Sequence, residues 1–378
     1  MPSDRPRLVF FVAEDWFFCS HFLDRALAAR DGGFDVSVLT RVRSHSERIA
    51  ASGLRLYPVE IGRRAANPVT ELRALHEIWR IYRKEQPALV HHVALKPIVV
   101  GTIAAKLAGV GSIVNAPVGM GFVFTSNTFS ARVLRPLLRT ALRLFLNPRG
   151  SRVIFENPDD LEAAVAGGLV RRAETILIRG AGVDLDRFSP EPEPEGPPVV
   201  VLVARMLWEK GIGVFVEAAR MLRDRHSDAR FWLVGAPDPG NPGSIPGPQL
   251  DAWQEEGVVQ WLGHRTDIAE ILARSSIVCL PSYREGLPKS LLEALAAGRP
   301  IVATDVPGCR ETVKDGENGI LVAPRDARSL AEALETLIRD KALRSRLGLK
   351  SRQLAEAEFG TARVSEATLA LYHSMLTG

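Results

Sequence analysis

Short apolar segments alternate with helical patterns along the chain, and this alternation restricts the fold more than any other feature. In the first half, apolar runs predict strands at residues 7–12, 36–39, 89–93, 113–114, 153–155 and 176–178. Helical patterns lie between them, for example at 72–82 and 98–107. Strands that alternate with helices build a parallel sheet with helices on both faces. The sequence therefore predicts a doubly wound α/β fold.

A second series of strands follows a break at residues 189–198. This segment reads SPEPEPEGPP, and its prolines exclude both a helix and a central strand. Beyond it, strands are predicted at 199–203, 231–234, 258–261, 277–280, 301–303 and 320–322. A chain of 378 residues suits two domains. We predict an N-terminal domain at 1–182, a linker at 183–198, a C-terminal domain at 199–360, and a final helix at 361–378 that can cross back to the N-terminal domain.

Basic residues are concentrated in the first half of the chain. Residues 1–190 contain 26 Lys and Arg against 18 Asp and Glu, and no acidic residue lies between Glu85 and Glu156. A field of this sign attracts phosphate groups. No window reaches the ~18 apolar residues that span a bilayer, and the N-terminus lacks the apolar core of a signal peptide. We therefore expect a cytoplasmic protein, and no nucleic-acid partner.

The segment 281–300, PSYREGLPKSLLEALAAGRP, carries two carboxylates that the fold would place at one sheet edge. Glu285 follows the predicted strand 277–280, and Glu293 lies one to two turns into the next helix. Ligands of open α/β sheets bind outside the carboxyl ends of the strands, and Gly286 allows backbone to approach an anion closely. The segment thus suggests a nucleoside-diphosphate site with carboxylates on ligand hydroxyls. Alternatively, Glu285 is a surface residue and Glu293 pairs with a nearby cation.

Two cations follow the first strand of the second domain. Arg205 and Lys210 flank the loop between strand 199–203 and a helix that begins at Ile212. Cations beside a helix N-terminus form an anion site, although both side chains could equally be solvated. Because Glu285 and Glu293 belong to the same sheet edge, the combination favours a nucleoside diphosphate bearing a sugar.

Other ligand signatures are absent or weak. Gly109-Val-Gly111 begins a dinucleotide fingerprint, but Val114 stands where the third glycine belongs, and there is no P-loop. Asp184-Leu-Asp186 has the D-x-D form of metal-dependent sugar transferases, yet it precedes the linker and is interpreted as a turn or helix cap. The three cysteines, Cys19, Cys279 and Cys309, lack metal-like spacing. We expect no disulfide, no metal and no cofactor.

The chain resembles the retaining glycosyltransferases of family 4, which have the two-domain GT-B fold. The resemblance covers nearly the whole chain and is carried by its most specific segments, VARMLWEKG at 203–211, EGLPKSLLE at 285–293, AGRPIVATDVPG at 297–308 and NGILV at 318–322. It implies two Rossmann-like domains that face each other across a cleft, a nucleotide-sugar donor, and transfer with retention and without a metal.

The resemblance also implies roles for individual residues. Arg205 and Lys210 would bind the donor diphosphate and stabilise its leaving charge, Glu285 would contact the donor sugar, and Glu293 would bind the ribose. The backbone of Gly286 and Leu287 would donate to phosphate or sugar. The segment 261–265, which includes Gly263, His264 and Arg265, would lie against the nucleobase.

The first domain departs from the commonest family pattern. Where many members have a Gly-Gly pair, this chain has the loop EDWFFCSH at 14–21, and Val118 occupies the place of a frequent histidine. The variant resembles a bacterial subgroup that acts on polyprenyl-diphosphate-linked saccharides, with a UDP-linked N-acetylhexosamine or hexose as donor. The candidates for contact with the acceptor or cleft are His21, His91, His92, Lys96, Gly119 and Gly121, and His91 and His92 could equally belong to the core.

An amphipathic helix is predicted at 129–146, FSARVLRPLLRTALRLFL. Arg132, Arg135, Arg139 and Arg143 form one stripe, and apolar residues cover much of the remaining surface. Such a helix can lie on an anionic membrane surface with its apolar face down, or it can be a domain helix with its arginines in water. The first alternative predicts a protein bound peripherally to the cytoplasmic face of the inner membrane.

The sequence therefore predicts a glycosyltransferase of bacterial surface-polysaccharide or glycan assembly. Two other functions remain compatible with the same motifs. A nucleotide-sugar epimerase of GT-B fold would release or isomerise the sugar without an acceptor. A binding protein that has lost turnover would hold the nucleotide sugar, although the intact Arg205, Lys210, Glu285 and Glu293 argue against it.

Overall fold

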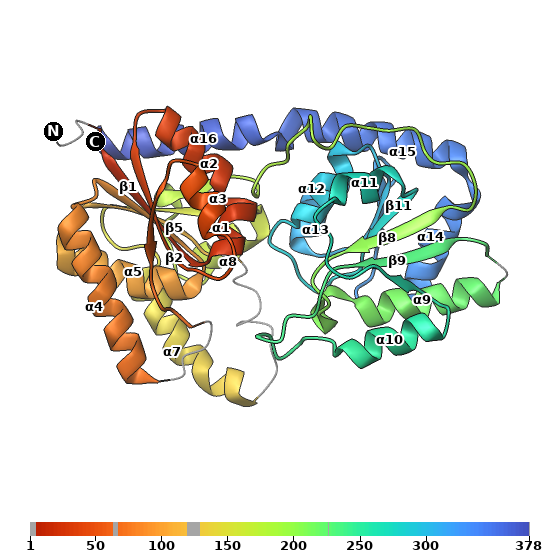
Figure 1. The fold of residues 1–378 in the computed structure, drawn as a ribbon, viewed down its shortest axis with the longest axis horizontal. Coiled ribbons are helices and arrows are strands. Elements are labelled where there is room, and N and C mark those ends of the chain that lie inside the picture. The colour runs from red at the N-terminus through yellow and green to blue at the C-terminus, as the bar shows by residue number, and fades with distance from the viewer. Residues whose placement is uncertain (1–4, 63–66, 119–128, 226, 378) are drawn as a thin grey trace. The chain divides into compact units, whose positions relative to one another are not determined.

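The chain forms two compact units in a computed structural model that describes residues 5–62, 67–118, 129–225 and 227–377. Within the helix that starts at Phe129, side chains are described only for Pro136 and from Leu138 onward. Unit 1 comprises Met1–Ala181 and Ala362–Gly378, and unit 2 comprises Gly182–Thr361. Both are α/β layers in which helices cover a parallel sheet (Figure 1).

Unit 1 is built on a seven-stranded parallel sheet with the order β3-β2-β1-β4-β5-β6-β7. The strands are β1 (Arg7–Glu14), β2 (Asp35–Arg41), β3 (Arg55–Pro58), β4 (Leu89–Val93), β5 (Ser112–Ala116), β6 (Ser151–Phe155) and β7 (Thr175–Leu177). The helices are α1 (Asp15–His21), α2 (Leu23–Asp31), α3 (Ser46–Ala51), α4 (Pro68–Glu85), α5 (Leu95–Ala108), α7 (Phe129–Phe145), α8 (Pro158–Ala166) and α16 (Thr361–Leu376), with a 3-10 turn at Arg172–Glu174.

Unit 2 is built on a six-stranded parallel sheet with the order β10-β9-β8-β11-β12-β13. The strands are β8 (Val199–Val203), β9 (Arg230–Val234), β10 (Gln260–Trp261), β11 (Ile277–Leu280), β12 (Ile301–Thr304) and β13 (Gly319–Val322). The helices are α9 (Ile212–Asp224), α10 (Gly247–Glu255), α11 (Ile268–Ala273), α12 (Lys289–Ala296), α13 (Pro307–Thr312), α14 (Ala327–Arg339) and α15 (Lys341–Leu354), with a 3-10 turn at Trp208–Lys210 and a π-helical turn at Ala355–Phe359.

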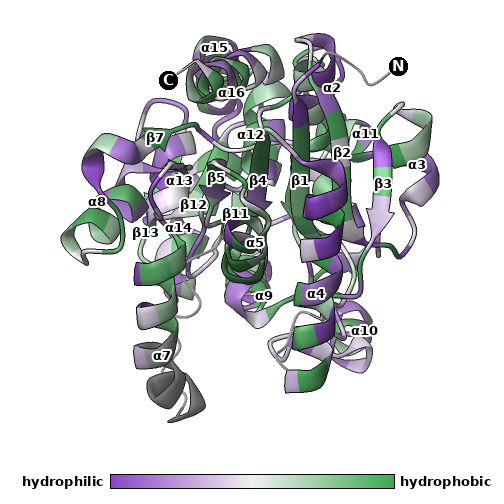
Figure 2. Ribbon diagram, turned by 90° about the vertical axis from the view of Figure 1, so that its left-hand side faces the viewer, coloured by the Kyte–Doolittle hydropathy of each residue, from purple (hydrophilic) through white to green (hydrophobic). Residues whose placement is uncertain are grey.

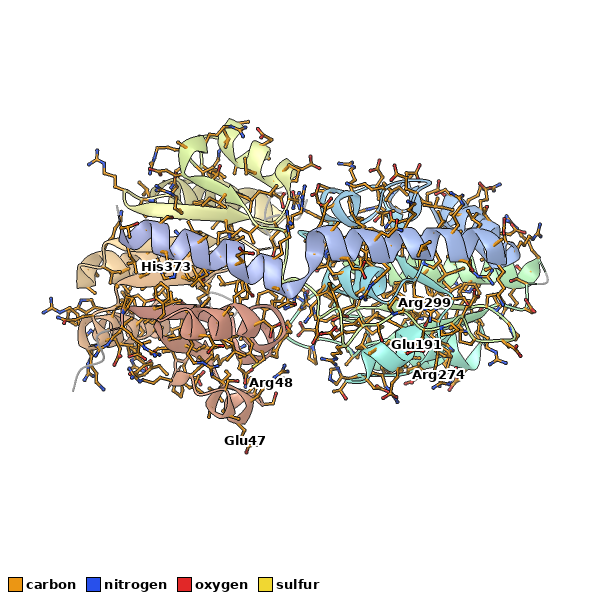
Figure 3. The ribbon with its side chains drawn as sticks, turned by 90° about the horizontal axis from the view of Figure 1, so that it is seen from above. Glu47, Arg48, Glu191, Arg274, Arg299 and His373 are labelled. Carbon is orange, nitrogen blue, oxygen red and sulfur yellow. The ribbon has the colours of Figure 1, made fainter. Side chains whose placement is uncertain are left out.

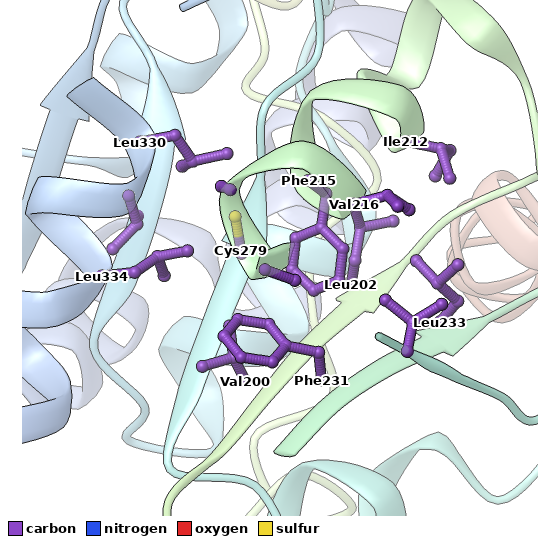
Figure 4. Packing of buried hydrophobic residues seen from close by; sticks show 14 of the residues in the cluster. Val200, Leu202, Ile212, Phe215, Val216, Phe231, Leu233, Cys279, Leu330 and Leu334 are labelled. Carbon is purple, nitrogen blue, oxygen red and sulfur yellow. The ribbon is translucent and has the colours of Figure 1, made fainter. Parts of the chain in front are cut away.

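Side chains from both faces of the central strands make the core of unit 2. On one face, Val200 and Leu202 of β8 pack with Phe215 of α9, and Phe215 meets Phe231 edge-on at 5.7 Å between ring centroids (Figure 4). Strands buried on both faces explain the continuous apolar runs in the sequence. The same burial fixes the position of the strand ends, and therefore of the loops that follow them.

The acidic, Pro-rich segment is not a free spacer. Its Glu193 carboxylate pairs with Arg344 of α15, with 2.9 Å between Oε1 and Nε. Glu191 and Arg299 line a cavity of about 290 Å³ beneath this segment (Figure 3). The prolines do prevent regular structure, but the ion pair between Glu193 and Arg344 holds the segment against the rest of unit 2.

One local prediction is wrong, and some short elements were not predicted. The edge strand β3 was missed, because its exposed Arg55 and terminal Pro58 do not form an apolar run. The loop expected at 14–21 is mostly the helix α1, and a separate helix α2 follows it after Phe22. The short helix α3 was also missed. The final helix α16 packs on unit 1, where Tyr372 is fully buried.

Candidate active site

The carboxyl ends of β8 and β11 meet where the strand order of unit 2 reverses. β9 and β10 lie on one side of this pair, whereas β12 and β13 lie on the other. Ligands of open α/β sheets bind at such a switch point. As the sequence predicts, the loop after β8 carries Arg205 and Lys210, and the loop after β11 carries Glu285.

Lys210 and Glu285 form an ion pair at this point. The distance from Lys210 Nζ to Glu285 Oε1 is 2.5 Å, and the two side chains are 19% and 8% exposed. A charge-assisted hydrogen bond in a site with little water is stronger than a surface ion pair. The two loops are also joined by a backbone hydrogen bond of 2.9 Å from Tyr283 N to Glu209 O. The sequence predicts that Lys210 and Glu285 lie at one edge of the sheet, and the structure shows that they are in direct contact.

Arg205 pairs with a residue that the sequence analysis missed. Its Nη1 donates to Oδ2 of Asp238 at 2.8 Å, and Asp238 lies in the loop after β9. The Arg205 side chain is 43% exposed, whereas that of Asp238 is 14% exposed. Asp238 thus binds the Nη1 atom of Arg205, while the side chain remains accessible to an anion.

Close backbone contacts shape the same edge. Gly211 has φ of +73°, and a Cβ atom there would lie 2.0 Å from Pro281 O. A Cβ atom at Gly308 would lie 2.3 Å from Gly286 O, and Gly308 N donates to Glu285 O at 3.2 Å. Leu287 is buried directly after this contact. Only glycine fits at 211 and 308, and this close approach fixes the backbone on either side of Glu285.

Glu293 lies on the second turn of α12, as predicted, and its side chain is 13% exposed. Burial raises the pKa of its carboxyl group, while the charges of Lys289 and Arg187 oppose this shift. Lys289 Nζ is 3.9 Å from Glu293 Oε1. A carboxylate that is largely removed from water requires hydrogen-bond donors, which ligand hydroxyls would supply.

The segment after β10 lies at the same sheet edge. Gly263 has φ of +67°, and its carbonyl accepts a 2.7 Å hydrogen bond from Gly235 N. Trp261 Nε1 donates to Gly235 O at 2.8 Å. The side chains of His264 and Arg265 are exposed, and Arg265 Nε donates to Asp267 Oδ1 at 2.8 Å. The chain therefore presents backbone of defined conformation here.

The histidines expected near the cleft are core residues. His91 and His92 are both fully buried in β4. His91 Nδ1 lies 2.6 Å from Tyr372 Oη. His92 Nδ1 lies 3.0 Å from Asn115 Oδ1, and its Nε2 lies 3.1 Å from Tyr82 Oη. Burial lowers the pKa of both rings, that of His92 to about 4. Neither residue can contact an acceptor, because β4 is central and these side chains point into its packed faces.

The other acceptor candidates differ in their surroundings. Lys96, at the start of α5, donates to Glu71 Oε1 at 2.6 Å and to Gly62 O at 2.7 Å, and its side chain is 21% exposed. The ring of His21 stacks on Phe17 at 4.2 Å between centroids. Val118 packs against the core of unit 1. Gly119 and Gly121 lie outside the described residues.

Helix α7 has the predicted amphipathic pattern, and hydrophilic and hydrophobic residues alternate along its ribbon (Figure 2). Leu142 and Leu146, at the end of the helix, are fully buried in a core cluster with Ile98 of α5. Arg139 and Arg143 are exposed, and Leu144 is 58% exposed. The side chains of Arg132 and Arg135 lie outside the description. The last turns of the helix therefore bury part of its apolar face in unit 1, whereas the described arginines are exposed.

The remaining ligand signals have structural explanations. Asp184 Oδ1 accepts hydrogen bonds from the backbone N of Asp186 and of Arg187, so the D-x-D segment is a turn, as interpreted from the sequence. Cys19, Cys279 and Cys309 are buried free thiols. Among the described residues, no cluster of His, Cys, Asp and Glu could hold a metal ion. In the same part of the chain, no helix is both long and apolar enough to cross a membrane.

Both units of the chain match known protein families. A family model described as glycosyl transferases group 1 matches residues 197–340, and a second, described as glycosyl transferase 4-like, matches residues 7–157. One relative is the N,N'-diacetylbacillosaminyl-diphospho-undecaprenol alpha-1,3-N-acetylgalactosaminyltransferase of Campylobacter jejuni. The two sequences are 28% identical over 362 residues, and the alignment covers 92% of this chain and 93% of that protein. The chain is 26% identical to the UDP-Gal:alpha-D-GlcNAc-diphosphoundecaprenol alpha-1,3-galactosyltransferase of Escherichia coli, over 82% of this chain and 81% of that protein.

Solved structures show the same fold. Sucrose-phosphate synthase from Thermosynechococcus elongatus superposes with a TM-score of 0.81 at 21% identity, covering 99% of this chain and 100% of that one. Anabaena HepE in complex with UDP-glucose superposes with a TM-score of 0.79 at 18% identity, covering 98% and 100%. The two parallel-sheet units are thus those of the GT-B fold, and the chain belongs to the group 1, family-4-like glycosyltransferases, enzymes that transfer sugar residues.

Proposed function

We propose that the protein transfers a sugar, an N-acetylhexosamine or hexose, from a UDP-sugar to a polyprenyl-diphosphate-linked saccharide, with retention at the anomeric carbon. The observation that carries the proposal is the Lys210–Glu285 pair beside Arg205 at the switch point of unit 2. Two relatives that match more than four-fifths of the chain have names that specify acceptors linked to diphospho-undecaprenol, and one of these names also specifies a UDP-sugar.

The chain's own cations would stabilise the departing diphosphate. As the bond between the anomeric carbon and the phosphate oxygen breaks, negative charge grows on the β-phosphate. Arg205 and Lys210 flank the loop where that phosphate would lie, and they need no reorganisation at the moment of reaction. Such preorganised charges typically contribute factors of ~10²–10³ in rate. The proposed transfer therefore needs no metal ion at the phosphates.

The carboxylates would position the donor. Glu285, held by Lys210, would accept hydrogen bonds from hydroxyls of the donor sugar, and backbone N–H groups at Gly286 and Leu287 would donate to the sugar or phosphate. Glu293 would accept from the ribose hydroxyls, which would satisfy its buried carboxyl group. The backbone at 262–265 would lie against the base. In unit 1, Lys96 would meet the acceptor diphosphate.

Unit 1 would also bind the anionic membrane surface that holds the acceptor. Arg139 and Arg143 are exposed on α7, Leu144 is 58% exposed beside them, and Val69 and Leu72 at the start of α4 are 53% and 64% exposed. Exposed arginines interleaved with apolar side chains bind anionic headgroups. The proposed location is therefore the cytoplasmic face of the inner membrane.

Product analysis tests the proposal. The enzyme would be incubated with a UDP-sugar and a synthetic polyprenyl-diphosphate disaccharide, and the product would be examined by mass spectrometry and NMR. The proposal predicts one added hexose or N-acetylhexosamine with the donor's α configuration. Isomerised or free sugar from donor alone would indicate an epimerase, and donor binding without turnover on any lipid-linked acceptor would indicate a binding protein. An added sugar of β configuration would contradict retention.

A further inference from the structure

Asp238 occupies a position that neither the family motifs nor the sequence analysis assigns. It lies in the loop between β9 and α10, and its Oδ2 accepts a 2.8 Å hydrogen bond from Arg205 Nη1. The two residues are 33 positions apart in the chain and belong to different loops of one sheet edge. We propose that Asp238 is a positioning residue that holds the Arg205 guanidinium for the donor diphosphate. This inference rests on the proposed donor site.

The loop that carries Asp238 is fixed to the loop that carries Arg205. Trp208 N donates to Gly243 O at 2.9 Å, and Ile245 N donates to Met206 O at 2.9 Å. At the start of the loop, Met206 N donates to Ala236 O at 3.0 Å. Three backbone hydrogen bonds therefore set the distance between the two loops. A carboxylate on one loop then has a defined position relative to an arginine on the other.

The loop is also ordered internally around Asp238. Asp238 N donates to Ser244 Oγ at 2.9 Å, and Asp238 O accepts from Asn241 N at 2.8 Å. Gly243 N donates to Asn241 Oδ1 at 2.9 Å. These bonds hold the backbone of Asp238, and its side chain is only 14% exposed. The carboxylate is thus a rigid acceptor rather than a mobile surface charge.

Arg205 needs such support more than Lys210 does. Lys210 is 19% exposed and contacts Glu285, whereas the Arg205 side chain is 43% exposed, and fixing a more exposed arginine costs more conformational entropy. Asp238 accepts from one nitrogen of the fork, and the exposed remainder of the guanidinium can meet the phosphates. An arginine already held in its binding geometry loses less conformational freedom when the ligand arrives.

The two carboxylates would then have different roles. Glu285 is bound to Lys210 and would contact the donor sugar. Substitution of Glu285 would therefore disturb the position of the sugar that is transferred. Asp238 would touch neither sugar nor phosphate and would act on the donor through Arg205. Its loss would weaken donor binding and would also weaken the stabilisation of the leaving diphosphate, because Arg205 serves both. Such a change raises KM for the donor and also lowers kcat.

The test is a double-mutant cycle in the full-length protein with UDP as probe. UDP affinity would be measured by calorimetry for the wild type, Asp238→Ala, Arg205→Ala and the double variant, and donor KM and kcat would be measured for the same proteins. We expect Asp238→Ala to weaken UDP binding about tenfold and to lower kcat/KM for the donor by at least the same factor. In the Arg205→Ala background, the same substitution is expected to have no further effect.

A conservative variant separates positioning from folding. Asp238→Asn keeps an oxygen that accepts from the guanidinium, so we expect UDP affinity within about threefold of the wild type. An equal effect of Asp238→Ala in both backgrounds, or tighter UDP binding by Asp238→Ala, would overturn the inference while leaving the donor site intact. If the wild type does not bind UDP at all, the proposed donor site is wrong, and this inference falls with it.

Discussion

Lys210 and Glu285, which are 75 residues apart in the chain, form an ion pair of 2.5 Å at the point where the strand order of unit 2 reverses. Lys210 follows β8 and Glu285 follows β11, and these strands are hydrogen-bonded neighbours. The pair therefore results from the sheet topology, which brings the ends of adjacent parallel strands together. The cation proposed for the phosphate and the carboxylate proposed for the sugar hydroxyls thus lie side by side.

Breaking this pair is expected to affect stability and activity differently. Lys210→Met leaves the Glu285 carboxylate buried without its partner, so we expect a loss of about 3 kcal/mol in the free energy of unfolding. Transfer should fall by about 10²-fold or more, because a charge that stabilises the leaving group is lost. Denaturant unfolding and initial rates measure the two effects. The double variant Lys210→Met/Glu285→Gln should recover most of the stability and none of the activity. Recovery of activity would contradict the proposed role of the pair.

Substitution of Gly211 tests the close backbone contact between Gly211 and Pro281, which lies next to the Lys210–Glu285 pair in the chain. Alanine at 211 would place Cβ 2.0 Å from Pro281 O, in addition to the strain of a φ of +73°. Gly257 has the same φ of +73°, but no atom lies within 4 Å of its Cβ position. We expect Gly257→Ala to cost about 1 kcal/mol from backbone strain alone, and Gly211→Ala to cost clearly more and to weaken UDP binding. Equal melting temperatures for the two variants would show that the contact does not constrain the site.

Glu293 should destabilise the donor-free protein when it is ionised. Burial raises the pKa of its carboxyl group above the ordinary 4.5, so the folded state binds this proton more tightly than the unfolded state does. Glu293→Gln is therefore expected to raise the melting temperature at pH 8, far above the ordinary pKa of 4.5. This gain should shrink as the pH falls through the folded-state pKa toward 4.5. A variant that is less stable than the wild type at pH 8 would contradict the direction of the shift.

The buried histidines should make the protein sensitive to mild acid. His92 has a pKa of about 4 in the folded state against 6.5 for a free ring, because burial penalises the charged form. The unfolded state binds the proton first, so stability is full above pH 6.5 and is lost as the pH falls toward 4. His92 alone should account for about 2 kcal/mol between pH 7 and pH 5, and His91 acts in the same direction.

Chemical denaturation at these two pH values tests that expectation. His92→Gln should be less stable than the wild type at pH 7, because contacts with Asn115 and Tyr82 are altered. Its stability should depend less on pH between 7 and 5. An unchanged pH dependence would show that His92 does not remain neutral in the folded protein.

Reversing charge on α7 tests the proposed membrane contact. Arg139 and Arg143 are exposed, and each basic residue near an anionic surface contributes about 1 kcal/mol. Arg139→Glu/Arg143→Glu should therefore lower binding to vesicles containing phosphatidylglycerol by at least tenfold in a sedimentation assay. The matched control is Arg346→Glu/Lys350→Glu, which makes the same charge change at exposed positions of α15 in unit 2. An equal loss in both variants would indicate a general charge effect and would contradict a specific role of α7.

Much of unit 2 could be predicted from the sequence because its signals are local. β8 and β11 are continuous apolar runs, and their observed bounds match the predicted ones. The start of α9 at Ile212 follows from the glycine before it. Glu285 and Glu293 then take the places that a strand, a loop and a helix dictate. Where the apolar pattern and the turn residues indicate the same strand and helix bounds, the secondary structure can be predicted from the sequence.

The missed features depend on contacts between distant segments. Asp238 lies 33 residues from Arg205, in a loop rich in proline and glycine, and nothing local marks it as a partner of that arginine. His91 and His92 sit in an apolar strand, and only the buried Tyr372 and Asn115 show why polar rings are tolerated there. β3 is a half-exposed edge strand, so its pattern is too weak to recognise.

The most direct test of the account is acceptor-dependent release of nucleoside diphosphate. Release would be measured from a panel of UDP- and GDP-sugars, with and without a membrane extract that contains polyprenyl-linked saccharides, for the wild type and Glu285→Ala. The exposed Glu332 of α14 provides a matched control, Glu332→Ala. We predict release that requires both a UDP-sugar and the extract, that Glu285→Ala abolishes, and that Glu332→Ala leaves unchanged. Release at equal rates without the extract, or full activity in Glu285→Ala, would contradict the account.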